Sequence, residues 1–183
     1  MEVVLIGGAI LWGLPLPVTA AQILWINLIA DSLPAVALAF EPKEKQLMEQ
    51  PPRQKLSPIL DAQLKVAIFT IGLFSALILL VIFALLGGGT VMFVALGLNS
   101  LFYVFVCRSL RRPIFEYNPF SNKALTFSVV FGVLALAAAV YLPPLQILLK
   151  TQPLGLAEWF FLFILGLANV LAIEIIKFAR ISI

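Results

Sequence analysis

The sequence contains no histidine and only one cysteine, Cys107. The lack of histidine excludes histidine-based metal sites and the Ser-His and Cys-His pairs of nucleophilic catalysis. A single cysteine excludes an internal disulfide. Phosphate-binding loops of the G-x-x-x-x-G-K-[ST] or G-x-G-x-x-G kind are also absent from the sequence, so this chain alone is expected neither to bind a nucleotide nor to be catalytic.

Charged residues are scarce as well. They make up 11% of the 183 residues, and 62% of the residues are hydrophobic, whereas a soluble domain carries about 25% charged residues. Such a chain cannot cover itself with polar surface, so the lipid bilayer is its expected solvent and partner. The twelve basic residues are scattered along the chain, so a nucleic acid partner is not expected.

Six apolar segments predict an all-α membrane protein, a single transmembrane helix bundle over residues 1–183. The segments are about 2–14, 20–40, 64–86, 90–107, 124–142 and 156–178. A helix needs about 20 residues to cross a bilayer, and the last five segments meet this requirement. The first spans only roughly 18 Å of helix, so we expect the outer end of a helix that begins before Met1; the alternative is a short re-entrant segment.

The basic residues predict how the bundle is oriented. Eleven of the twelve lie between the second and third segments, between the fourth and fifth, or at the C-terminal end, and only Lys150 falls on the other side. Lys and Arg are enriched in cytoplasmic loops. Both termini and the loops 41–63 and 108–123 are therefore expected to be cytoplasmic.

The second segment has a polar centre, "WINLIADSLP" at residues 25–34. Asn27 and Asp31 are four residues apart and so share one helix face. Pro34 has no backbone N–H, so the centre of this helix is expected to unwind and free the carbonyl of Ala30. Carboxylate, amide and carbonyl oxygens together suit a small cation. The alternative is a protonated Asp31 that is hydrogen-bonded to a neighbouring helix.

Other polar residues of the apolar segments are weaker candidates. Asn99 and Ser100 lie near the middle of the fourth segment, either as cation ligands or as partners in interhelical hydrogen bonds. Glu2, on its own, is typical of an ordinary interfacial residue. Glu174 has Lys177 three residues later, a spacing that favours an ion pair along the helix.

Three stretches carry a resemblance to a known family. The stretch "LPLPVTAAQILWINLIADSLPAVALAFEPKEKQLMEQPPR" resembles the sixth-helix region of the calcium-pump class of P-type ATPases. The stretches "CRSLRRPIF…NPFSNKAL" and "YLPPLQILLKTQPLGLAEWFF" resemble the eighth-to-tenth-helix region of its bacterial members. The resemblance covers the whole chain. It implies a six-segment bundle, from the end of helix five to helix ten, in a bacterial plasma membrane.

The resemblance also implies roles for particular residues. Asn27 and Asp31 fall on the cation ligands of the sixth helix, and Glu2 falls on a glutamate ligand of the fifth. Ala30 stands where two-site calcium pumps have a ligand threonine, and Ser100 stands near an eighth-helix glutamate. These two departures imply one calcium ion per cycle, with only weaker contributions from Ser100, Asn99 and the backbone of Ala30.

The ATP-hydrolysing part of such a pump is not in this sequence. The family's phosphorylated aspartate lies in a D-K-T-G motif, which does not occur here. The resemblance therefore implies that ATP and Mg²⁺ act only through the N-terminal part of the pump: the first helices and the actuator, phosphorylation and nucleotide domains. Two alternatives stay open: a free-standing cation channel or secondary carrier, and an inert pump fragment. The short first segment and the absence of an internal inverted repeat favour the pump.

Overall fold

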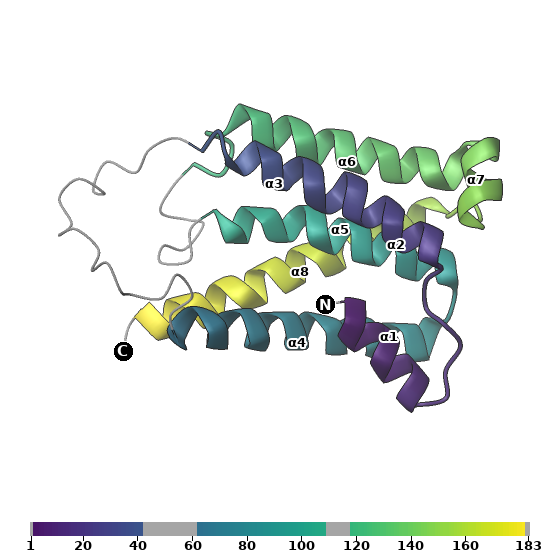
Figure 1. The fold of residues 1–183 in the computed structure, drawn as a ribbon, viewed down its shortest axis with the longest axis horizontal. Helices are drawn as coiled ribbons and strands as arrows, with labels where there is room; N and C mark the ends of the chain where they lie inside the picture. The colour runs from purple at the N-terminus through teal and green to yellow at the C-terminus, as the bar shows by residue number, and fades with distance from the viewer. Residues whose placement is uncertain (1, 42–61, 109–117, 182–183) are drawn as a thin grey trace.

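The computed structural model describes residues 2–41, 62–108 and 118–181 (Figure 1). Within these ranges all regular secondary structure is helical, which confirms the predicted all-α bundle. The elements are α1 (Glu2–Leu11), α2 (Ala20–Ile26), the π-helix η1 (Asn27–Ser32), α3 (Leu33–Leu38), α4 (Ala62–Leu86), α5 (Gly89–Cys107), α6 (Lys123–Tyr141), α7 (Pro143–Leu149) and α8 (Leu156–Ile181).

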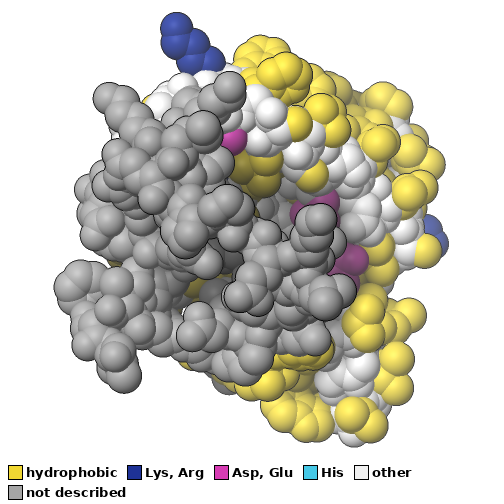
Figure 2. Space-filling model, turned by 60° about the vertical axis from the view of Figure 1, so that its left-hand side comes forward, with side chains coloured by type: hydrophobic (Ala, Val, Ile, Leu, Met, Phe, Trp, Pro, Cys, Tyr) yellow, Lys and Arg dark blue, Asp and Glu magenta, His cyan; other side chains and the backbone are white. Residues whose placement is uncertain are grey.

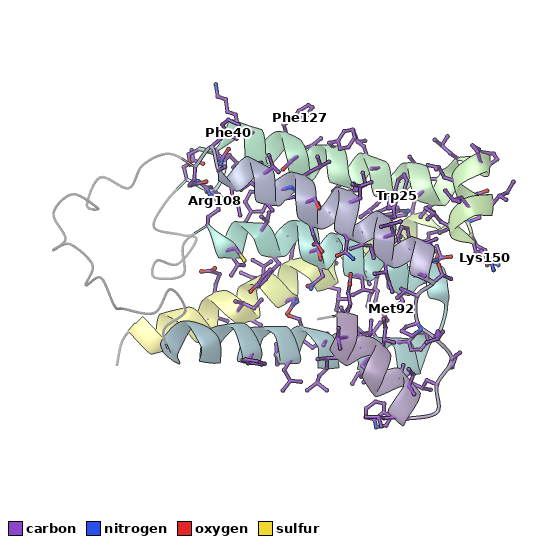
Figure 3. The ribbon with its side chains drawn as sticks, viewed as in Figure 1. Trp25, Phe40, Met92, Arg108, Phe127 and Lys150 are labelled. Carbon is purple, nitrogen blue, oxygen red and sulfur yellow. The ribbon has the colours of Figure 1, made fainter. Side chains whose placement is uncertain are left out.

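Four stretches of helix in the described part of the chain are long and apolar enough to cross a membrane. They are Ala20–Leu38, Gly89–Cys107, Lys123–Tyr141 and Leu156–Ile175. Their outward faces carry large exposed apolar side chains, such as Phe127 on α6 and Leu167 on α8. Figure 2 shows hydrophobic side chains gathered along the flank of the bundle, and Figure 3 shows Phe127 projecting away from it. A surface of this kind suits lipid rather than water, and the protein is an integral membrane protein.

Helix α5 forms the centre of the bundle. It packs against α8, α6, α4 and the second segment, and Figure 1 shows it between the α3 and α6 pair and the α4 and α8 pair. Two glycines allow α5 and α6 to approach closely: a Cβ on Gly97 would come within 2.7 Å of Leu136, and one on Gly132 within 2.5 Å of Leu101. Small residues at helix contacts are the usual means of packing helices in a bilayer.

The N-terminus lies part way along the bundle rather than at either end (Figure 1). From there α1 packs against α4 and runs to the end of the bundle where α2 begins. The connection turns at Gly13, which has a φ of 66°. Thr19 then caps α2, since its side chain accepts from the backbone of Gln22 while the Gln22 side chain accepts from the backbone of Thr19. Glu2 interacts with Asn27 and Asp31 and so lies at the depth of the middle of the second segment.

The second segment stays helical through its polar centre, so the prediction of an unwound centre is wrong. α2, η1 and α3 follow one another without a break, and the backbones of Ile26 and Leu33 on either side of η1 are both right-handed helical. A π-helix closes wider i→i+5 turns and so retains hydrogen bonds that an unwound segment would lose. Backbone polar groups at membrane depth need such partners, and the side chain of Ser32 also donates to the Asn27 carbonyl at 2.7 Å.

The connection between α6 and α8 contains a short helix, α7, that the sequence pattern does not predict. Two prolines begin it, and it ends at Lys150, whose φ of 53° is left-handed. The carbonyl of Leu149, at the end of α7, accepts a hydrogen bond of 2.9 Å from the buried side chain of Gln22. This bond ties the first turn of α2 to α7.

Candidate cation site

The polar centre of the second segment lies on η1, where Asn27 and Asp31 both present exposed side chains. Thr19 fixes where the preceding helix begins, and Pro34 lies in the first turn of the following one. Between these points the helix widens into the π-helical turn. Two polar side chains at the membrane's interior therefore come from a stretch whose backbone departs from the α-helix.

The structure brings Glu2 of α1 and Ser100 of α5 to this stretch. The Glu2 carboxylate lies within hydrogen-bonding reach of the Asn27 side chain and close enough to Asp31 for the two charges to interact. The Asp31 carboxylate lies within hydrogen-bonding reach of Ser100. Two carboxylates, an amide and a hydroxyl thus converge from three helices, α1, η1 and α5.

This arrangement favours a positively charged occupant. Two carboxylates in a medium of low dielectric repel each other unless a proton or a cation lies between them. All four side chains offer oxygen atoms, which are the ligands that Ca²⁺ and Mg²⁺ take. No group of three or more His, Cys, Asp and Glu side chains that could together hold a metal ion occurs in the described ranges, and the donors that converge here are two carboxylates and two neutral side-chain oxygens. Such a set fits a hard cation and offers nothing to a soft metal.

The candidate site is open on one side. Asn27 and Asp31 are exposed, whereas Glu2 and Ser100 are half-buried. A calcium ion takes six to eight oxygen ligands, more than these four side chains supply in a compact shell. Further ligands would have to come from water or from another part of a larger protein.

The structure places Asn99 away from this group, in a separate buried cluster between α4, α5 and α8. The side chain of Asn169 on α8 donates to Asn99, and at 3.0 Å to Ser75 on α4. All three side chains are buried. Asn99 thus makes the interhelical hydrogen bonds that its alternative interpretation predicts, and we leave it out of the proposed site.

Two other residues that the sequence singles out are buried. Ala30 is 1% exposed and its side chain packs in the core of the bundle, and the role of its backbone carbonyl as a weaker ligand stays a prediction. Glu174 is buried on α8, next to Ile173, which packs against Val106. The side chain of Lys177 lies outside the described residues, so the predicted ion pair with Glu174 stays a prediction.

Ser32, which the sequence pattern did not single out, forms a hydrogen bond beside the site. Its hydroxyl donates to the carbonyl of Asn27, five residues earlier. Its role could have been predicted from its position in the sequence, two residues before Pro34 and five after Asn27. A serine at that spacing can satisfy a carbonyl wherever a helix widens from i→i+4 to i→i+5 closure.

One family model matches most of the chain. It describes "Cation transporting ATPase, C-terminus" and matches residues 15–179. That range contains α2, η1 and α3 and the later helices as far as residue 179 of α8, so the match covers the stretch that carries Asn27 and Asp31.

Individual relatives are similar over nearly the same range. "Calcium-transporting ATPase 1" of Bacillus cereus (strain ATCC 10987 / NRS 248) is 30% identical over 98% of this chain and 23% of its own length. "Calcium-transporting ATPase" of Bacillus subtilis (strain 168) is 31% identical over 92% of this chain and 20% of its own. "Calcium-transporting ATPase type 2C member 2" of Homo sapiens is 35% identical over 86% of this chain and 17% of its own length. The chain thus spans about a fifth of the length of these relatives.

Proposed function

The chain belongs to the family of cation-transporting ATPases, in which it matches the C-terminus, and on this premise we propose that it is the cation-binding membrane domain of an ATP-driven pump. The observation that carries the proposal is the convergence of Glu2, Asn27, Asp31 and Ser100 beside a π-helical turn. Glu2, Asn27 and Asp31 are the proposed ligands, and Ser100 orients the Asp31 carboxylate.

Calcium is the proposed cargo. The names of the three relatives describe calcium transport, and a site of two carboxylates and neutral oxygens matches the charge and ligand preference of Ca²⁺. With Ala30 and Ser100 in place of further acidic or hydroxyl ligands, one ion per cycle is the proposed stoichiometry. ATP and Mg²⁺ would act through domains outside this chain, namely the first helices and the actuator, phosphorylation and nucleotide domains. Family membership does not favour a free-standing channel or carrier.

Transport measurements test this proposal directly. In sealed vesicles that contain the complete pump, micromolar Ca²⁺ should stimulate both ATP-driven uptake and formation of the phosphorylated intermediate. Mn²⁺ should substitute in part, because it also takes oxygen ligands, whereas Na⁺ should not. Stimulation of phosphorylation by Na⁺ alone, or Ca²⁺ uptake without ATP, would refute the proposal of a calcium pump and indicate a different kind of transporter.

We also propose a plasma membrane location in a bacterium, with both termini cytoplasmic. Arg108 and Lys123 lie at one end of the bundle and Lys150 at the other, and Figure 3 shows Arg108 and Lys150 at opposite ends. The excess of basic residues toward the Arg108 end marks it as cytoplasmic.

Cysteine labelling checks this orientation. In a Cys107→Ala background, Lys123→Cys should react only with a reagent that reaches the cytoplasm, and Lys150→Cys only with one applied outside. Both side chains are exposed, so failure of access is not expected. Labelling of both positions from the same side would refute the orientation.

A further inference from the structure

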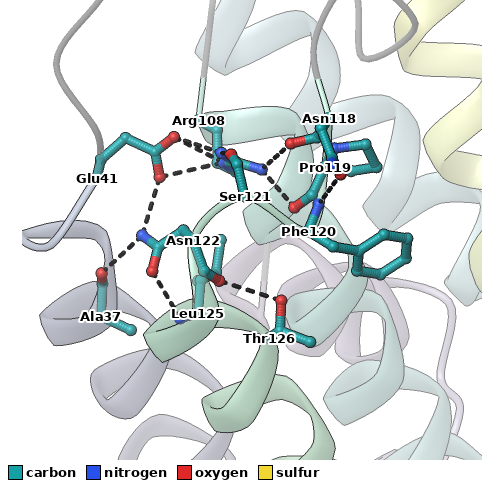
Figure 4. Close-up of polar contacts among 10 residues, drawn as sticks. All are labelled: Ala37, Glu41, Arg108, Asn118, Pro119, Phe120, Ser121, Asn122, Leu125 and Thr126. Carbon is teal, nitrogen blue, oxygen red and sulfur yellow. Dashed lines mark hydrogen bonds and ion pairs between the residues drawn. The ribbon is translucent and has the colours of Figure 1, made fainter.

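An ion pair joins the end of the second segment to the end of α5 (Figure 4). The guanidinium of Arg108 donates to the Glu41 carboxylate from Nε at 2.9 and 3.1 Å and from Nη2 at 2.5 Å. The Arg108 side chain is 2% exposed and the Glu41 side chain 30%. A bidentate, largely buried pair of this kind is far more constraining than a surface salt bridge.

The remaining donors of Arg108 reach the chain just before α6. Nη2 donates to the Ser121 hydroxyl at 2.6 Å, and Nη1 donates to the backbone carbonyls of Asn118, at 3.2 Å, and of Pro119. One guanidinium therefore links three elements: the segment after α3, the end of α5 and the approach to α6. Lysine lacks the planar fork that makes all of these bonds at once.

Asn122 completes the same cluster. Its side-chain oxygen caps α6 by accepting from the Leu125 N–H at 3.0 Å. Its side-chain nitrogen donates to the Glu41 carboxylate at 2.9 Å and to the Ala37 carbonyl, in the last turn of α3, at 3.0 Å. The Ala37 carbonyl also accepts from the backbone N–H of Phe40 at 3.1 Å, so the amide of Asn122 adds a second partner, from a neighbouring helix, at the end of α3.

The second segment is thus held at both of its ends. Gln22 ties its first turn to α7, and the cluster of Glu41, Arg108 and Asn122 ties its last turn to α5 and α6. The π-helical turn with Asn27 and Asp31 lies between these two attachments. A shift of either end would turn or slide both side chains relative to Glu2 on α1 and Ser100 on α5.

We propose that Arg108 is a positioning residue for cation binding: through Glu41 and Asn122 it fixes the end of the helix that carries Asp31, and so holds Asp31 opposite Ser100. This inference rests on the proposed function. The partners of Arg108 in Figure 4 are Glu41, Asn118, Pro119 and Ser121, and none of these is a proposed cation ligand. Arg108 acts through the register of α3 and η1, and the substrate whose affinity it sets is the transported cation.

Three variants of the complete pump test the proposal, and each weakens the cluster at a different residue. Arg108→Lys keeps the positive charge but loses the planar guanidinium. Glu41→Gln keeps the size of the side chain but loses its negative charge. Asn122→Asp keeps an oxygen that can cap α6 but loses the two N–H donors of the amide. Each should raise the Ca²⁺ concentration for half-maximal phosphorylation by roughly tenfold, the effect of losing one charge-assisted hydrogen bond. The maximal phosphorylation level should stay close to that of the unmodified pump.

Lys123→Gln is the matched control, because Lys123 is an exposed charge at the start of α6; it should leave the Ca²⁺ dependence unchanged. An unchanged Ca²⁺ dependence in the three variants would overturn the proposal, and so would a loss of maximal phosphorylation without a change in affinity. If Arg108→Lys does not accumulate in the membrane, the Ca²⁺ dependence of phosphorylation in Asn122→Asp decides whether the proposal holds. Failure of the proposed function itself is distinguishable, because Asp31→Asn would then transport normally.

Discussion

Asp31→Asn is expected to abolish cation transport and cation-dependent phosphorylation in the complete pump, while the protein still inserts into the membrane. The substitution keeps the shape of the side chain and removes one of the two negative charges at the candidate site. One unit charge at about 4 Å is worth about 4 kcal/mol at the effective dielectric constant of a protein site. A loss of that size weakens cation binding roughly 1000-fold, which places it beyond physiological cation concentrations.

Insertion should not suffer, because a carboxylate at the bilayer centre itself costs about 2.5–3.5 kcal/mol. The amount of Asp31→Asn in the membrane should therefore equal or exceed that of the unmodified protein. Glu158→Gln is the matched control, since it removes an exposed carboxylate at the start of α8 and should transport normally. Acidification of the unmodified pump should also weaken cation binding, because protons compete for Glu2 and Asp31. Normal transport by Asp31→Asn would make Asp31 a structural residue.

The helical fold could be predicted because its main determinant is local. Long apolar segments separated by proline, glycine and charged residues predict membrane helices wherever the chain cannot cover itself with polar surface. The segment at 90–107 corresponds to α5, and the one at 124–142 to α6. α7 was not predicted because it has only seven residues and the first two are prolines, and a proline pair is equally typical of a loop.

The backbone of the second segment could be predicted only in part. Pro34 correctly marks a departure from the α-helix near Asp31, since its missing N–H follows from the sequence alone. Whether the helix then unwinds or widens depends on what satisfies the freed carbonyls. In the structure the Ser32 hydroxyl donates to the Asn27 carbonyl, and η1 packs against α5 and α6. The packing of η1 depends on distant helices and cannot be read from the local sequence.

The cluster around Arg108 was beyond prediction for a different reason. Glu41 and Arg108 are 67 positions apart in the sequence, and Glu41 and Asn122 are 81 apart. The sequence places all three in the loops 41–63 and 108–123, which are expected to be cytoplasmic, but which helix ends adjoin is set by how α3, α5 and α6 pack. The contact of Gly97 with Leu136 and of Gly132 with Leu101 draws α5 and α6 together and so decides which polar groups can meet.

Pro34→Ala is expected to weaken cation binding on the order of 100-fold while it stabilises the helix. Alanine restores a backbone N–H and removes the proline ring, which together cost about 3 kcal/mol inside a helix. The π-helical turn should then close to regular α-helix, and closing out one residue rotates the segments on its two sides by about 100° relative to each other. Asn27 and Asp31 would no longer face Glu2 and Ser100 together, and a misplaced ligand can cost this much in a preorganised site.

The measurement is the Ca²⁺ concentration for half-maximal phosphorylation, together with the thermal midpoint of the purified complete pump. Pro143→Ala is the control, because Pro143 also begins a helix, is exposed and lies far from η1; it should alter neither the Ca²⁺ dependence nor the midpoint by a comparable amount. For Pro34→Ala we expect a higher thermal midpoint together with a lower Ca²⁺ affinity. Both follow from closing the π-helical turn, because that change stabilises the helix and also moves Asp31 away from Glu2 and Ser100. Unaltered affinity would mean that the π-helical turn persists without Pro34, or that cation binding does not depend on it.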